Sequence, residues 1–278
     1  MEIGHRPANH ATQVIFICRR SIMFIEVGEA KIYAATFGST SSPVIVGIGG
    51  WIGSWELWAE PFSILSQRWH TIAYDHRGAG ATTAPAESIN FDRLVDDVFA
   101  VLDAYKVEHC VLAAESAGAL TALGAALKNP KRITGLVIVD GMYFREASPE
   151  NDPFLLGLRN AYSKTLDRFV EACVPEPDSE HIKRWGRQIL NRASQEAAIA
   201  LYLSASGIDL RNELGRISQP TLILHGEADV IASIDGAKQL AQILPHAKLS
   251  VFPGAGHVPT MTRPKEVARE ITDYFDSI

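Results

Sequence analysis

The sequence predicts an α/β protein built on a doubly wound, mostly parallel β-sheet. Short, mostly apolar runs of strand length recur along the chain, and three of them cover residues 44–48, 135–140 and 220–224. Segments with apolar residues at helical spacing separate many of these runs. Strands that alternate with helices in this way predict a parallel sheet covered on both faces, with ligands at the carboxyl ends of the strands.

The first elements predict a hairpin followed by the sheet proper. Residues 23–27 and 31–35 flank Gly28 and Glu29 and are typical of a β-hairpin. Residues 44–48 form an apolar run of the kind that lies inside parallel sheets. We expect residues 54–67 to be helical, with Pro61 kinking or splitting the helix.

The middle of the chain continues the alternation. Residues 70–74 predict a strand, and Asn90 predicts the N-cap of an amphipathic helix that carries Leu94, Val98 and Val101. The apolar run that starts at Cys110 predicts the next strand, and residues 119–127 predict the helix after it.

The alternation stops over residues 142–206, which show helical patterns only. We therefore expect a core of residues 21–141 and 207–278, with residues 142–206 inserted as a small helical unit. In the last part, residues 248–252 predict a strand and a final helix begins at Pro264. Residues 1–20 form an N-terminal extension to which the sequence assigns no role.

Composition excludes several classes of function. The chain has 47% hydrophobic and 21% charged residues and a net charge of −6, without a basic stripe, which argues against nucleic-acid binding. Three widely spaced cysteines (Cys18, Cys110 and Cys173) make a disulfide framework or a zinc site improbable and favour the reducing cytoplasm. The apolar run 14–18 is far shorter than the ~20 residues that span a bilayer, so we expect no membrane association.

Ser116 lies where a strand changes into a helix, with Ala114 and Gly118 two residues to either side. This small-x-Ser-x-small pattern is typical of a nucleophile elbow, a tight turn that only small neighbours accommodate. A serine that simply caps a helix after a buried strand would give the same local pattern. The stretch alone does not decide between the two interpretations.

Two further polar residues follow later strands. Asp229 comes after the strand at 220–224, and His257 comes after the strand at 248–252. The order is Ser116, Asp229, His257, and residues of these three types at strand ends predict a catalytic triad. Asp140 also ends a strand and is the alternative to Asp229 as the acid of the triad.

With these residues in place, the chain resembles the α/β-hydrolase family over nearly all of residues 21–278. The motifs that carry the resemblance are Gly49-Gly-Trp51, Asp75-His-Arg-Gly-Ala-Gly80, Ala114-Glu-Ser-Ala-Gly118, Gly226-Glu-Ala-Asp229 and Gly256-His257. The resemblance implies an eight-stranded sheet with residues 142–206 as a cap over the active site. The small cap is most similar to that of enol-lactonases and small bacterial esterases.

The resemblance also implies roles for single residues. Ser116 would be the nucleophile, His257 the general base and Asp229 the acid that orients the histidine. The backbone N–H groups of Trp51 and Ala117 would form the oxyanion hole. The sequence departs from the family at Gly49-Gly50, where a His-Gly pair is usual, and at Ala114, where glycine is usual.

We predict a serine hydrolase that cleaves an ester or lactone of a small, mainly apolar molecule through an acyl-enzyme on Ser116. Trp51, Val230, Val258 and Tyr143 are the predicted substrate-binding residues. No Arg or Lys accompanies the catalytic motifs except Arg77, which we expect to be structural together with Asp75; Glu115 is expected to point away from the pocket.

No metal ion or organic cofactor is implied. A carbon–carbon bond hydrolase of ring-cleavage products would use the same triad, and a ligand-sensing protein with slow turnover is the alternative from another class. The sequence does not predict an oligomeric state.

Overall fold

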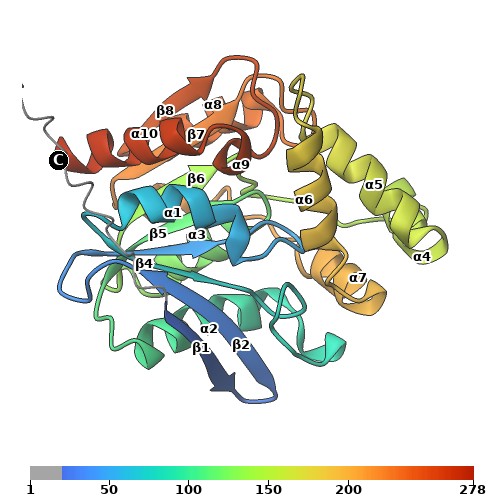
Figure 1. The fold of residues 1–278 in the computed structure, drawn as a ribbon, viewed down its shortest axis with the longest axis horizontal. Coiled ribbons are helices and arrows are strands. Elements are labelled where there is room, and N and C mark those ends of the chain that lie inside the picture. Colours follow the sequence, from blue (N-terminus) through green and yellow to red (C-terminus); the bar gives the residue numbers. More distant parts are fainter. Residues whose placement is uncertain (1–20) are drawn as a thin grey trace, which may run out of the picture.

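The computed structural model describes residues 21–278, and its centre is one eight-stranded sheet (Figure 1). The strands lie in the order β1-β2-β4-β3-β5-β6-β7-β8, with β2 antiparallel to both neighbours and all other pairs parallel. The predicted doubly wound, mostly parallel sheet is therefore confirmed. The strands are β1 (Ser21–Val27), β2 (Ala30–Phe37), β3 (Val44–Ile48), β4 (His70–Tyr74), β5 (Cys110–Glu115), β6 (Ile133–Val139), β7 (Thr221–Gly226) and β8 (Ala247–Phe252).

The N-terminal hairpin has the predicted place. Strands β1 and β2 pair from Ser21 with Thr36 to Val27 with Ala30, and the turn between them contains Gly28 at a φ of 58°. Only glycine adopts such a φ without steric cost, which is why this turn occurs where it does. The predicted extension of residues 1–20, with Cys18, lies outside the described residues.

Helices cover both faces of the sheet and create two apolar cores. Along β5, Val111 and Ala113 belong to one core while Leu112 and Ala114 belong to the other, because successive strand residues point to opposite faces. Helices α1 and α10 pack into the first core, and α2, α3 and α8 pack into the second. The helices of the body are α1 (Ala59–Leu65), α2 (Phe91–Ala104), α3 (Gly118–Lys128), α8 (Ile234–Ile243), α9 (Pro259–Thr262) and α10 (Pro264–Asp276), with short 3₁₀ turns at η1 (Trp55–Trp58), η2 (Ala86–Ser88) and η3 (Leu214–Arg216).

The helical segment predicted over residues 54–67 is split, but Pro61 does not split it. The 3₁₀ turn η1 ends at Trp58, and α1 begins at Ala59. Pro61 lies in the first turn of α1, where backbone N–H groups have no partner within the helix, so its missing N–H costs nothing. The predicted N-cap is present: Asn90 accepts a hydrogen bond from the backbone N–H of Arg93 at 3.0 Å and starts α2.

The remaining four helices lie between β6 and β7 in the sequence. They are α4 (Pro153–Asn160), α5 (Tyr162–Cys173), α6 (Glu180–Leu190) and α7 (Gln195–Ser204), and we refer to residues 142–206 as the cap. Figure 1 shows these helices gathered on one side of the body formed by the sheet and its flanking helices. Within residues 21–278, no helix is long and apolar enough to cross a membrane.

Candidate active site

Ser116 occupies a tight turn between β5 and α3. Its φ is 51°, in the left-handed region that side chains other than glycine rarely adopt. The backbone N–H of Ser116 donates to the carbonyl of Val139 at 2.9 Å, which fixes the turn to the end of β6. A Cβ atom at Gly118 would lie 2.4 Å from the carbonyl oxygen of Gly49. Glycine is therefore required at position 118, because the turn of Ser116 and the loop of Gly49 approach each other so closely.

The structure brings Ser116, His257 and Asp229 into one hydrogen-bonded chain. The distance from Ser116 Oγ to His257 Nε2 is 2.8 Å, and the distance from His257 Nδ1 to Asp229 Oδ2 is 2.7 Å. A carboxylate only accepts, so Nδ1–H donates to Asp229 and leaves Nε2 free to accept the serine proton. The three residues follow β5, β8 and β7, whose carboxyl ends lie at the same edge of the sheet.

The loop after β7 keeps the Asp229 carboxyl ionised. Burial alone would raise the pKa of this carboxyl, but the hydrogen bond from His257 and the backbone N–H groups of Ala232 and Ile231 lower it below the ordinary value. Asp229 Oδ1 accepts from Ile231 at 2.7 Å and from Ala232 at 3.0 Å. Asp229 therefore carries a negative charge next to the His257 ring. That charge would stabilise the imidazolium that forms when the ring accepts a proton.

Two backbone N–H groups beside Ser116 are free to bind an oxyanion. Within residues 21–278, neither the N–H of Trp51 nor that of Ala117 donates a hydrogen bond to the protein. A Cβ atom at Gly50 would lie 3.1 Å from Cβ of Ser116, so the loop that carries Trp51 passes directly over the serine. Free donors next to a nucleophile are what a tetrahedral intermediate needs.

Residues of the Asp75-His-Arg turn hold this loop in place. His76 Nε2 donates to the carbonyl of Gly50 at 2.9 Å, and burial lowers the pKa of His76 to about 4, so the ring is neutral. The Asp75 carboxyl accepts from the N–H of Trp55 at 2.6 Å and of Ala81 at 2.7 Å, while burial raises its pKa to about 6. These contacts brace the loop where the family's usual His-Gly pair is replaced by two glycines.

Arg77 is structural in its contacts. Its guanidinium forms a buried, bidentate ion pair with Asp97 at 2.7 and 2.9 Å and also contacts Glu29 at 2.8 Å. The side chain lies on the side of α2, and it is absent from the residues that line the cavities at Ser116.

The side chain of Trp51 ties the oxyanion loop to the cap. Its Nε1–H donates to the carbonyl of Ala198 in α7 at 2.8 Å. The indole also makes edge-to-face contacts with Phe154 and Phe169, with ring centroids 5.1 and 5.4 Å apart. The loop that carries this residue thus passes over Ser116 while the indole is anchored in the cap.

Two cavities meet at Ser116. The first has a free volume of about 60 Å³ and is lined by His257, Val258 and apolar residues of α5 and α6. The second is larger, about 330 Å³, and is lined by Val230, Phe154 and residues of α7 among others. Trp51 lies on the wall of both.

One predicted substrate-binding residue lies elsewhere. Tyr143 lines neither cavity at Ser116; its ring packs in the core against Phe144, and its hydroxyl donates to Gln239 at 3.1 Å. Tyr143 lies at the start of the cap, and the hydrogen bond to Gln239 in α8 directs its side chain away from Ser116. The prediction for Tyr143 is therefore wrong.

The cavities also contain two polar residues that the sequence interpretation missed. Glu115 lines the first cavity, contrary to the expectation that it points away, and its Oε1 accepts from Thr260 Oγ1 at 2.8 Å. Arg145 lines the second cavity, with its guanidinium 3.6 Å from the ring centroid of Tyr202 and 4.0 Å from Asp152. The acidic neighbour offsets much of the arginine's charge.

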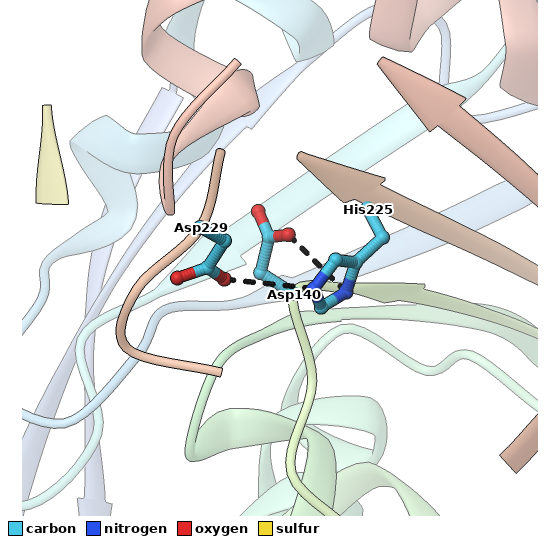
Figure 2. Close-up of side chains that lie close together, drawn as sticks. All are labelled: Asp140, His225 and Asp229. Atoms are coloured by element: carbon cyan, nitrogen blue, oxygen red, sulfur yellow. Dashed lines mark ion pairs between the residues drawn. The ribbon is translucent and has the colours of Figure 1, made fainter. Parts of the chain in front are cut away.

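One group of side chains in residues 21–278 has its potential ligand atoms close enough to hold a metal ion. It consists of Asp140, His225 and Asp229, each with one such atom within 4.8 Å of the others (Figure 2). The donor set does not suit a cation. Both oxygens of Asp229 already accept N–H groups, and His225 Nε2 donates to the carbonyl of Ala232 at 3.0 Å. A metal ion bound by Asp229 would compete with the three N–H groups that its oxygens accept.

The buried carboxyl of Glu115 gives the first testable prediction. Burial raises its pKa from 4.5 to about 8, with the Asp229 charge adding to the shift and the Thr260 hydrogen bond opposing it. The folded protein therefore holds a proton that the unfolded chain releases, and Glu115 lowers stability as pH rises from about 5 to 8. In the unchanged protein, Glu115 should make the free energy of unfolding fall by up to about 1.4 kcal/mol per pH unit over this range. Replacing Glu115 by Gln should remove that fall.

Urea unfolding of the Glu115→Gln variant and of the unchanged protein at several pH values between 5 and 8 measures this difference. Glu108→Gln is the matched control, because Glu108 is exposed. Equal pH slopes for Glu115→Gln and the unchanged protein would show that Glu115 is ionised in the folded state.

Comparisons with known proteins agree with this geometry. The family model described as serine aminopeptidase, S33, matches residues 43–261. A pimeloyl-[acyl-carrier protein] methyl ester esterase of Nitrosomonas europaea is 30% identical over 85% of this chain and 96% of its own length. A 3-oxoadipate enol-lactonase of Acinetobacter baylyi is 24% identical over 83% of this chain and 88% of its own.

Among solved structures, an enol-lactonase from Burkholderia xenovorans superposes with a TM-score of 0.85 at 20% identity, over 91% of this chain and all of the other. At this identity the likeness shows the fold alone. The family match covers most of the chain and includes the loop of Trp51, the turn of Ser116 and the loops of Asp229 and His257. The chain therefore belongs to the α/β-hydrolase superfamily of enzymes, in the family described as serine aminopeptidase, S33.

Proposed function

We propose that this protein is a serine hydrolase that cleaves the carboxylic ester or lactone bond of a small, mainly apolar substrate through an acyl-enzyme on Ser116. The observation that carries the proposal is the hydrogen-bonded chain from Ser116 through His257 to Asp229, at the junction of two cavities. Relatives named as an esterase and an enol-lactonase support the choice of bond.

The mechanism follows from the contacts around the serine. His257 Nε2 accepts the proton of Ser116 Oγ as that oxygen attacks the carbonyl carbon of the substrate. The N–H groups of Trp51 and Ala117 then stabilise the negative oxygen of the tetrahedral intermediate. His257 returns the proton to the leaving oxygen, and water, activated by the same ring, later releases the acid. Asp229 stabilises the imidazolium in both halves of the reaction.

The cavity walls support a substrate that is mainly apolar. The first cavity is narrow, and its wall is formed by side chains such as Val170, Ile189 and Met261. The second is larger and therefore receives the bulkier part of the substrate. Arg145 is its one cationic lining residue, and Asp152, whose carboxylate lies 4.0 Å from the guanidinium, would repel an anion bound there. We also propose a reducing compartment, the cytoplasm, because Cys110 and Cys173 are both free and buried.

A graded series of p-nitrophenyl esters tests the proposed substrate class. The kcat/KM should rise from acetate through butyrate towards hexanoate, by about fourfold for each methylene that becomes buried (~0.8 kcal/mol), until the cavity is full. Neutral esters and lactones should be preferred over analogues of the same length that end in a carboxylate. The measurement is initial-rate kinetics at constant ionic strength.

Two results would contradict the proposed substrate class. A constant kcat/KM from acetate upwards would mean that the apolar walls do not bind the acyl chain. A clear preference for the anionic analogues would mean that Arg145 is a ligand for the substrate, and Arg145→Gln should then abolish that preference.

A further inference from the structure

Asp140 is a buried carboxyl next to the proposed triad that the mechanism above does not use. It directly follows β6, has no solvent exposure and adopts a φ of 46°, in the left-handed region. Figure 2 shows the ring of His225 connected by ion-pair contacts to the carboxyls of Asp140 and Asp229. A strained, fully buried acid beside another acid requires a partner that neutralises it.

The two carboxyls differ in the number of donors that they receive. Asp229 accepts three N–H groups, from the His257 ring and from the backbone of Ile231 and Ala232. Asp140 accepts one, from the backbone of Gly226 to Oδ1 at 2.8 Å, and its Oδ2 has no partner within the described chain. Hydrogen bonds to the charged form favour it, so the negative charge belongs on Asp229.

His225 adds no proton to Asp140. Its Nε2 faces the carbonyl of Ala232, which only accepts, so Nε2 carries the ring proton. Burial lowers the pKa of His225, and in the neutral ring Nδ1 has a lone pair. That lone pair lies 3.4 Å from Oδ1 of Asp140. An ionised Asp140 would therefore face two groups that only accept, the Nδ1 of His225 and the Asp229 carboxylate.

We propose that Asp140 is a positioning residue that carries a proton at neutral pH and that fixes the start of the Asp229 loop through its bond to Gly226. A proton on Asp140 removes the repulsion between two neighbouring carboxylates, so the negative charge stays on Asp229 beside His257. The bond of Asp140 to Gly226 N–H ties the end of β6 to the end of β7, where the Asp229 loop begins. The inference rests on the proposed function, since it assigns Asp140 a role in orienting that triad.

The electrostatic surroundings agree with this placement of the proton. Burial, followed by the charge of Asp229, raises the pKa of Asp140 well above its ordinary value; Glu115 is a further carboxyl nearby. The other titratable groups of the cluster are His225 and His257, with the buried thiol of Cys173 nearby. None of these supplies a positive charge to Asp140 while both rings are neutral.

Infrared difference spectroscopy at neutral pH tests the location of the proton without reference to activity. Subtracting the spectrum of the Asp140→Asn variant from that of the unchanged protein should reveal one carbonyl band of a protonated, buried carboxyl. Asp103→Asn, at an exposed position, is the matched control and should reveal none. If no such band appears for Asp140→Asn, the proposal is wrong, whatever the protein hydrolyses.

Kinetics test the positioning role. Asp140→Ala should lower kcat about tenfold or more with KM within about twofold, because the proposed interaction orients the triad and does not touch substrate. Asp140→Asn keeps a neutral side chain of the same size that can accept from the N–H of Gly226, and it tolerates the left-handed backbone, so it should recover most of that loss. An Asp140→Ala variant with unaltered kcat would overturn the role. Should Asp140→Ala not fold, an Asp140→Asn variant as inactive as Asp229→Asn would overturn it.

Discussion

Replacing Ser116 by Ala is expected to lower kcat/KM for any substrate of this protein by about 10⁴-fold or more, while the fold is retained. Among the described residues, this hydroxyl is the hydrogen-bond partner of His257 Nε2, at 2.8 Å. Without it no acyl-enzyme can form, and the free N–H groups of Trp51 and Ala117 have no tetrahedral intermediate to stabilise. The variant loses one hydrogen bond, worth about 1 kcal/mol, so Tm should change by only a few degrees.

Steady-state kinetics together with a thermal unfolding curve measure both halves of this prediction. A fluorophosphonate, which reacts with activated serines, should label the unchanged protein and a Ser39→Ala control but not Ser116→Ala. Ser39 is a suitable control because it lies in an exposed turn. Residual activity within about tenfold of the unchanged protein, at normal Tm, would mean that Ser116 is not the nucleophile.

The sequence was sufficient where the signal is local or periodic. The apolar runs of β3, β5, β6 and β7 are longer than those of an exposed strand, and each of these strands pairs with a neighbour on both sides. The turn at Ser116 was predictable because the φ of 51° and the contact of Gly118 with Gly49 both demand small neighbours. The three proposed catalytic residues were predicted to meet because each follows a strand, and the carboxyl ends of parallel strands lie at the same edge of the sheet.

Side-chain direction in the cap was not predictable, because it depends on contacts between residues distant in the chain. Tyr143 faces Gln239, nearly a hundred residues away, rather than the cavity. Arg145 reaches the second cavity by stacking on Tyr202, and neither residue belongs to a motif. The anchoring of the Trp51 indole on Ala198 likewise joins a core loop to an insertion.

The partners of buried polar groups were also beyond the sequence. Glu115 is the last residue of β5, and the whole strand is buried. The hydrogen bond from Thr260 in α9 explains why a carboxyl is tolerated at this buried position. Asp75 was expected to be structural, but only its bond to Trp55 and the bond of His76 to Gly50 show which loop this turn supports. Such pairings depend on the three-dimensional approach of loops from different strands, which no spacing encodes.

Replacing Asp229 by Asn is expected to lower kcat by about 10³- to 10⁴-fold with a small change in KM. The amide can donate to His257 Nδ1, which favours the ring tautomer with the proton on Nε2, and that tautomer cannot accept the proton of Ser116. The lost negative charge also leaves the imidazolium without its 2.7 Å partner. Kinetics across pH separate these effects from a binding defect, since substrate contacts are untouched.

Asp140→Asn is the matched comparison, because it makes the same chemical change on a carboxyl oxygen less than 4.8 Å away. Its loss of kcat should be at least a hundredfold smaller than that of Asp229→Asn, since the amide replaces a carboxyl that is already neutral. The reverse order would assign the acid of the triad to the end of β6. The donor count argues against that order: three N–H groups stabilise a negative charge on Asp229, whereas Asp140 receives one and faces two acceptors.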